Sequence, residues 1–173
     1  MGLPSSMIQG KEAFISLGPD KYEVKVVPEI KADENVILDS VKLSIDGSKL
    51  AGSGKVSLKG YPKVFNGYDL DRVNKDEVTK EVIGYTSKGN NKFDLRKYEI
   101  VDLEDRDKPT IINYDFAVSD YLTSVDNEIY VNLNLTRSRR SKLLPLTRIA
   151  PFERDYKAIQ EEVVEFEVHK VTR

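Results

Sequence analysis

The sequence predicts a mainly β protein, specifically an antiparallel β-sandwich of about eight to ten strands with one or two short inserted helices. Three observations lead to this fold class. Apolar and polar side chains alternate in several separate runs, glycine- or asparagine-containing turns follow those runs, and only one stretch has a helical period. Because the 173 residues match the size of one domain, we expect residues 1–173 to form a single β-sandwich-like accessory domain.

The first half of the chain contains the predicted strands with the clearest turns. Residues 22–26 alternate Tyr and Val with charged side chains, which is typical of a half-buried strand, and Pro28 ends this run or places it at a sheet edge. Two further alternating runs, residues 41–45 and 55–59, flank the turn Asp46-Gly47-Ser48. An Asp-Gly step between two such runs predicts a β-hairpin.

The middle of the chain changes period. Within residues 70–83 apolar side chains fall near one helical face, and Asn74 with Glu77 has the spacing of a capping box. This predicts either one helix or two short helices with a break near Asn74. Before it, Gly52 and Gly54 interrupt a strand and indicate a bulge or a close backbone approach. After it, alternation returns at three later segments, residues 112–118, 129–135 and 164–168.

Composition removes several classes of function. The 27 basic and 29 acidic residues leave a net charge of −2, so there is no overall field to attract nucleic acid. No apolar run approaches the ~18 residues of a transmembrane helix, so we expect no membrane span. The absence of cysteine excludes a thiol nucleophile, a thiolate zinc site and a disulfide framework. We expect no cofactor, since Gly52-Ser53-Gly54 lacks the strand-to-helix setting of a phosphate-binding loop.

Candidate catalytic and metal-binding residues are few. His169 is the only histidine, and it falls among charged side chains on the polar face of the last predicted strand. We therefore interpret it as a solvated residue and not as a general base. Four acidic residues near one turn offer oxygen ligands of the kind calcium prefers: Asp102, Glu104, Asp105 and Asp107. Their spacing lacks the glycine and the distant glutamate of the known calcium loop, so an acidic turn is the favoured interpretation.

One local charge cluster remains as a candidate binding site. Five bases occur without an acid in a twelve-residue stretch: Arg137, Arg139, Arg140, Lys142 and Arg148. They form either a docking patch for an acidic protein, lipid headgroup or polyanion, or a solvated loop balanced by the glutamates of residues 161–167. Tyrosines are the other candidates, because a tyrosine suits sugar or protein contacts as well as sheet packing: Tyr61, Tyr68, Tyr85 and Tyr130.

From residue 100 onward, several short motifs follow one another in an order that resembles that of a known family. It comprises the segment 108–116 (KPTIINYDF), Ser119-Asp120-Tyr121, the segment 127–135 (NEIYVNLNL), and Pro151-Phe152 followed by Arg154 and Tyr156. These motifs resemble the uncharacterised C-terminal β domain that follows a transglutaminase-like domain in secreted bacterial proteins. Residues 2–4 and 10–15 resemble the exit from the transglutaminase-like domain. Leu133-Asn134 departs from the pattern, which has Asn-Pro there.

The resemblance implies a location in the bacterial envelope, periplasmic or extracellular, and a catalytic cysteine that lies outside this chain. Its implied partner is an adjoining transglutaminase-like domain, or a surface protein or glycan. We therefore expect a non-catalytic structural or interaction module. Two alternatives stay open from the residues alone. One is a carboxylate-dependent polysaccharide hydrolase, which would use two converging acids. The other is a domain that binds polyanions or carbohydrates.

Overall fold

The structure is a computed structural model that describes residues 3–72, 74–126, 128–135 and 159–167. Its secondary structure confirms the predicted fold class, because the described part is 50% strand and 19% helix, with two short helices. The described residues contain nine strands, within the predicted range. No helix among them is long and apolar enough to cross a membrane.

The elements follow one another along the chain with short connections. The strands are β1 Glu12–Gly18, β2 Lys21–Val26, β3 Val36–Asp46, β4 Lys49–Leu58, β5 Phe93–Val101, β6 Thr110–Val118, β7 Leu122–Val125, β8 Glu128–Val131 and β9 Ile159–Phe166. The helices are α1 Tyr61–Arg72 and α2 Lys75–Thr86, with two 3-10 turns, η1 Ser6–Ile8 and η2 Ala32–Glu34.

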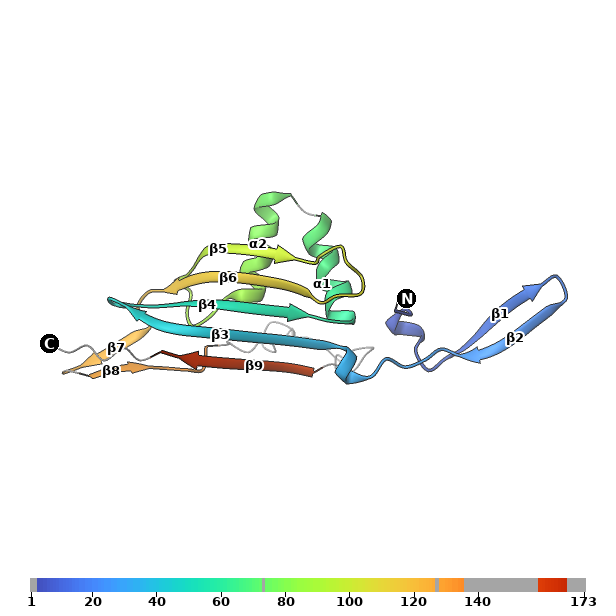
Figure 1. The fold of residues 1–173 in the computed structure, drawn as a ribbon, viewed down its shortest axis with the longest axis horizontal. Helices are drawn as coiled ribbons and strands as arrows, with labels where there is room; N and C mark the ends of the chain where they lie inside the picture. Colours follow the sequence, from blue (N-terminus) through green and yellow to red (C-terminus); the bar gives the residue numbers. More distant parts are fainter. Residues whose placement is uncertain (1–2, 73, 127, 136–158, 168–173) are drawn as a thin grey trace, which may run out of the picture.

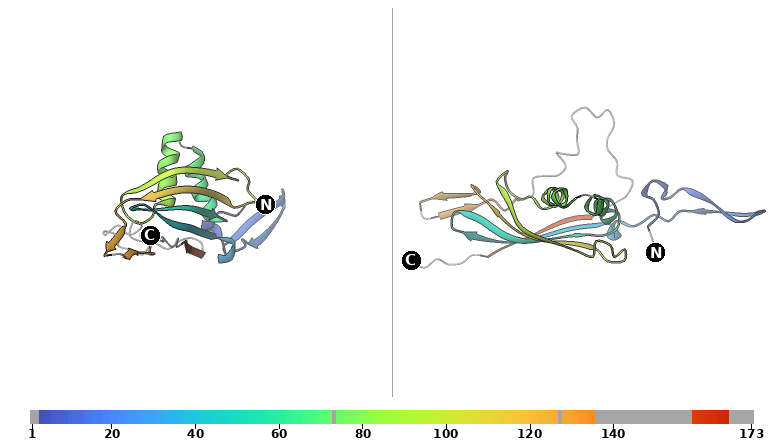
Figure 2. Two further views of the ribbon diagram at one scale, coloured as in Figure 1. Left: turned by 60° about the vertical axis from the view of Figure 1, so that its left-hand side comes forward. Right: turned by 90° about the horizontal axis from the view of Figure 1, so that it is seen from above.

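The strands form one central sheet and two separate hairpins. The central sheet has the order β5-β6-β4-β3-β9; its neighbours pair antiparallel except for β9, which runs parallel to β3. Helices α1 and α2 lie on one face of this sheet (Figures 1 and 2). The β1–β2 hairpin projects beyond one end of the sheet, and the β7–β8 hairpin lies near the other end (Figure 1). We call the central sheet with its two helices the body.

The core lies between the central sheet and the helices. Its fully buried side chains come mainly from β3, β4 and β6 and are joined by Leu70, Val82 and Leu135. Gly52 and Gly54 of β4 face this core, and the register of β4 with both neighbours is continuous, so neither residue forms a bulge. The predicted close approach is made by aromatic rings, because a Cβ on Gly54 would lie 2.2 Å from Cζ of Tyr114.

The predicted break between two helices is confirmed at Asn74. Its side chain accepts hydrogen bonds from the backbone N–H groups of Asp76 and Glu77, and the Glu77 side chain accepts one from the Asn74 N–H, which is a capping box. Helix α1 begins at residue 61, well before the predicted start. There Asn35 Oδ1 accepts a hydrogen bond from the Tyr61 N–H at 3.0 Å. That partner lies 26 positions away, so local sequence could not reveal it.

Candidate functional site

Among the described residues, the β1–β2 hairpin carries the largest group of exposed apolar side chains, three on each strand. In its antiparallel register Phe14 lies opposite Val24, and Tyr22 and Val26 flank Val24 on the same side. The exposed fractions of these side chains are 69% for Phe14, 65% for Tyr22, 53% for Val24 and 61% for Val26. We call these four residues the hairpin face. Large apolar side chains on a strand normally pack against a core. Within the described residues nothing covers the hairpin face.

Local contacts hold the hairpin face together. The rings of Phe14 and Tyr22 stack with their centroids 4.6 Å apart and an interplanar angle of 23°. On the opposite side of the hairpin, Lys25 and Glu23 form an exposed ion pair with an N–O distance of 2.6 Å. The hairpin therefore has one mainly apolar side and one side that also carries charge, although Ile15 and Leu17 on that second side are exposed as well.

The base of the hairpin is tied to the segments that enter and leave it. The Gly10 N–H donates to the carbonyl of Val27, and the Val27 N–H donates to the carbonyl of Lys11, both at 2.9 Å. Gln9 Oε1 accepts a hydrogen bond from the Ile30 N–H at 2.6 Å. These bonds extend the β1–β2 ladder toward the body. They fix the two arms of the hairpin to each other where they meet the rest of the chain.

The entering arm is also tied to α1. The Tyr61 hydroxyl donates a hydrogen bond of 2.6 Å to the carbonyl of Pro4, while the Tyr61 side chain is 2% exposed. Burial raises the pKa of this phenol above its usual value, since the phenolate would lose its hydration. Of the two roles left open for Tyr61, the structure therefore supports packing and not a water-facing binding surface. Tyrosine at this position anchors the N-terminal segment to the body.

The other tyrosine candidates divide between core and surface. Tyr85 is partly buried against the core, whereas Tyr130 is 54% exposed on β8 and donates a hydrogen bond of 2.5 Å to Glu128. The side chain of Tyr68 lies outside the described residues. So do the basic candidates Arg137, Arg139, Arg140, Lys142 and Arg148, together with His169. Their predicted roles stay predictions.

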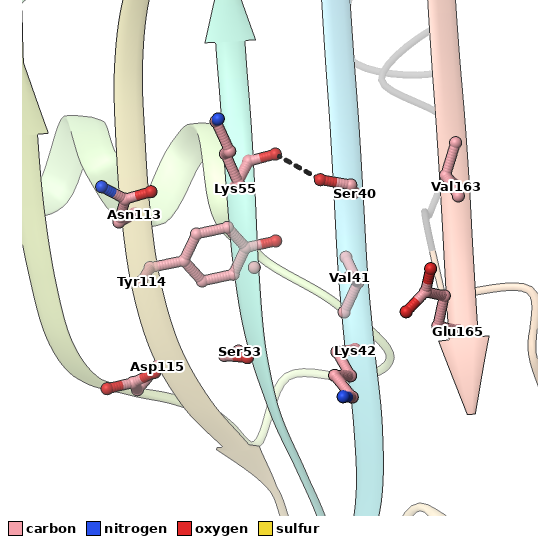
Figure 3. A pocket seen from close by; sticks show the side chains of 11 residues that line it. Ser40, Val41, Lys42, Ser53, Lys55, Asn113, Tyr114, Asp115, Val163 and Glu165 are labelled. Carbon is pink, nitrogen blue, oxygen red and sulfur yellow. Dashed lines mark hydrogen bonds between the residues drawn. The ribbon is translucent and has the colours of Figure 1, made fainter. Parts of the chain in front are cut away.

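The second candidate surface is the face of the central sheet opposite the helices. Two shallow hollows of about 390 and 450 Å³ lie on it, and both are lined by Lys42, Ser53 and Asp115. Figure 3 shows the first hollow, whose lining side chains come from β3, β4, β6 and β9 and include Lys42, Lys55 and Glu165. Asp115, Ser53, Lys42 and Glu165 are register partners in successive strands, so they form a row across the sheet.

This row separates the two carboxylates that line the first hollow. Asp115 on β6 and Glu165 on β9 are three strand spacings apart, or roughly 14 Å between backbones. Paired carboxylates of glycoside hydrolases lie about 5–9.5 Å apart. Between them Lys42 is paired with Glu167, and this ion pair and the charge of Glu165 raise the pKa of Lys42. The row fits an ordinary water-facing sheet surface with opposite charges on adjacent strands.

The acidic turn between β5 and β6 is organised by a lysine. The ammonium of Lys63, on α1, donates to the carbonyls of Asp102 and Lys108 at 2.6 and 2.8 Å, and also to the carbonyl of Asp105. Burial lowers the pKa of Lys63, against the opposing effect of the nearby aspartates. Lys108 in turn bridges the carboxylates of Asp102 and Asp105. Within the described ranges there is no group of three or more His, Cys, Asp or Glu arranged to hold a metal.

One charged pair is buried inside the body. The Lys88 side chain, 1% exposed, is paired with Asp39 of β3, and the Tyr114 hydroxyl donates to the other oxygen of Asp39 at 3.3 Å. This cluster joins the segment after α2 to the helix-covered face of the sheet. Sequence reasoning missed it, because Lys88 follows a helix in a stretch rich in turn residues. Lys88 and Tyr114 are both paired with Asp39, so we interpret the cluster as a structural link between the two segments.

Sequence reasoning also missed the hairpin face. The alternation of residues 22–26 predicted a half-buried strand, and only the structure shows that the apolar side is uncovered. One signal was available: apolar residues occur on both sides of β1, which a strand with a single dry face does not require. No family model, curated protein or solved structure matches this chain.

Proposed function

We propose that this chain is a non-catalytic interaction module that adjoins a transglutaminase-like domain in a bacterial envelope protein, in the periplasm or outside the cell. The observation that carries the proposal is the hairpin face, a projecting apolar surface. The position beside a transglutaminase-like domain comes from the motif resemblance of residues 2–4, 10–15 and 108–135.

The physical argument starts from the instability of an isolated hairpin. Two strands alone are marginally stable in water, and a third strand or a packed layer is needed for independent stability. Covering apolar surface contributes about 25 cal/mol per Å². A hairpin that exposes Phe14, Tyr22, Val24 and Val26 together therefore gains stability from a partner surface. Exposed apolar groups of this kind mark protein contact sites.

The attachment of the hairpin favours a domain in the same polypeptide. The Tyr61–Pro4 hydrogen bond holds the entering segment against the body, only eight residues before β1 begins at Glu12. A domain joined ahead of Pro4 is thereby kept close to the hairpin. Contact with it then has a high effective concentration, because binding is intramolecular.

The test compares the isolated chain with the longer polypeptide that its gene encodes. We expect the open reading frame to continue into a transglutaminase-like domain, and a frame limited to residues 1–173 would refute the placement. In hydrogen exchange, amides of β1 and β2 should be protected at least about tenfold more in the longer polypeptide. The β7–β8 hairpin, with exposed Ile129 and Tyr130, is the matched control and should not change.

A face variant separates docking from mere proximity. Val24→Thr keeps the β-branched shape of the side chain but adds a hydroxyl to the hairpin face, and it should reduce the protection of β1 and β2 in the longer polypeptide. Val125→Thr on β7 is the equivalent change on the control hairpin. Equal protection in the Val24→Thr variant and the wild type would show that the hairpin face is not the contact.

A further inference from the structure

The outer edge of β2 has backbone groups that point away from β1. Val27 donates its N–H toward β1, to the carbonyl of Lys11. Because successive residues of an antiparallel strand alternate their N–H and C=O directions, those of Tyr22, Val24 and Val26 point to the opposite edge. The sheet that contains β2 has two strands among the described residues, so no described strand pairs with this edge. Such an edge is a template for another strand.

We propose that β2 pairs with β2 of a second copy of this chain, antiparallel about a two-fold axis at Val24. The two hairpins then form one four-stranded sheet with the order β1-β2-β2-β1. In this register Val24 lies opposite Val24 of the second copy, and Tyr22 lies opposite Val26 of the second copy. The outward N–H and C=O groups of these three residues meet in hydrogen-bonded pairs. A two-fold contact of this kind is self-complementary and closes at a dimer.

Charge complementarity and the length of β2 together select this register. With the axis at Val24, Glu23 lies opposite Lys25 of the second copy and Lys25 opposite Glu23, so two ion pairs form. With the axis at Glu23, the two Glu23 side chains face each other and Lys21 faces Lys25. With the axis at Lys25, the two Lys25 side chains face each other. With the axis at Tyr22, Lys21 lies opposite Glu23 of the second copy, but only residues 21–23 of β2 pair, whereas the axis at Val24 pairs residues 22–26. Opposite charges across a strand pair are stabilising and like charges are destabilising, so charge and paired length together favour Val24.

The dimer also extends the apolar side of the hairpin. Tyr22, Val24 and Val26 share one side of β2, and the two-fold pairing keeps that side continuous between the copies. The contact uses the edge of β2 and leaves the hairpin face open. It therefore does not depend on the proposed docking to an adjoining domain. It also gives a four-stranded sheet, which exceeds the three strands that a sheet with an apolar face needs for independent stability.

The test is sedimentation velocity of the full chain over a range of concentrations at low salt. We expect a dimer whose fraction rises with concentration. Glu23→Lys and Lys25→Glu should each raise the dimer Kd about tenfold or more, because each puts like charges opposite each other twice per dimer. The double swap E23K/K25E restores the opposite charges and should return the Kd to near the wild-type value. Glu99→Lys on β5, also exposed, is the control for overall charge and should have no effect.

A backbone variant tests the edge directly. Val24→Pro removes an N–H that points away from β1, so it leaves the β1–β2 ladder intact while blocking the central hydrogen bonds of the dimer. We expect this variant to be monomeric, with its hydrogen exchange in β1 unchanged from that of the dissociated wild type. A monomeric wild type at all concentrations up to about 1 mM overturns the proposal. So does a dimer that survives Val24→Pro, or a double swap that fails to restore pairing.

Discussion

The hairpins β1–β2 and β3–β4 each contain an alternating strand but have opposite environments. Residues 22–26 of β2 and residues 41–45 of β3 alternate apolar and polar side chains, and each strand is joined to its partner by a turn that contains glycine. In β3–β4 the apolar side faces the core, and Leu43, Leu50 and Val56 are 0–1% exposed. In β1–β2 the equivalent side chains Tyr22 and Val26 are more than half exposed. Alternation therefore determines that a strand forms, whereas the cover over its apolar side comes from elsewhere in the chain or from a partner.

The largest expected difference between the hairpins concerns apolar truncation. Leu43→Ala should lower the free energy of unfolding by about 4 kcal/mol, because it leaves a cavity in the core. Leu17→Ala, at an exposed leucine of β1, should change it by less than about 0.5 kcal/mol. Urea denaturation of both variants measures the contrast. Similar losses in the two variants would mean that β1–β2 is covered in the isolated chain.

A second comparison uses the ion pairs of the two regions. Lys88→Met should cost about 3 kcal/mol, since it leaves the partly buried Asp39 without its cation. Lys25→Met removes one member of the exposed Lys25–Glu23 pair and should cost less than about 1 kcal/mol in the monomer. Denaturation at low protein concentration isolates the monomer. If Lys88→Met were neutral, the buried pair would not link the 86–89 segment to β3.

Glycine substitutions give smaller effects of opposite sign within the body. Gly54→Ala places a methyl group against the Tyr114 ring and should cost about 2 kcal/mol, because the ring must move within a packed core. Gly84→Ala in α2 meets no atom within 4 Å and should stabilise by about 0.5 kcal/mol, because alanine favours the helix. Thermal unfolding of both variants checks this. If Gly54→Ala unfolded at the same temperature as the wild type, the Tyr114 ring would not pack against Gly54 of β4.

The smallest expected effects are titrations at the turn between β5 and β6. The pKa of Lys63 lies below its usual value because of burial, and the pKa of Lys108 lies above it because of its hydrogen bond to Asp105. Lys63 therefore binds fewer protons folded than unfolded between its folded pKa and 10.5, so its contribution to stability rises with pH there. The contribution of Lys108 is present below 10.5 and is lost as the pH rises through its folded pKa.

NMR titration of the lysine Nζ groups measures both directions in one experiment. Lys63→Arg and Lys108→Arg assign the two signals and serve as controls for each other. Coincident titration of the two ammonium groups would contradict the arrangement in which Lys63 is enclosed by three carbonyls while the exposed Lys108 bridges two half-buried carboxylates.

Local patterns predicted much of the fold and little of the candidate site. The capping box at Asn74 and the turn at Gly47, where φ is 60°, are encoded within a few residues, so the sequence revealed both. The start of α1 depends on Asn35, and the cluster of Lys88 with Asp39 joins residues 49 positions apart. No periodicity carries such long-range information. For the same reason the sequence predicted the strand β2 but not the exposure of its hairpin face.

The sequence by itself determined the mainly β fold class, a helical region near residues 70–83 and the absence of cysteine, because these depend on composition and on side-chain periods of two and 3.6 residues. Tertiary structure alone decided which apolar sides are covered, that β9 joins β3 in parallel, and that Lys63 holds the acidic turn. Those features are set by contacts between distant segments. Burial is a property of what lies above a strand, and no alternation within the strand specifies it.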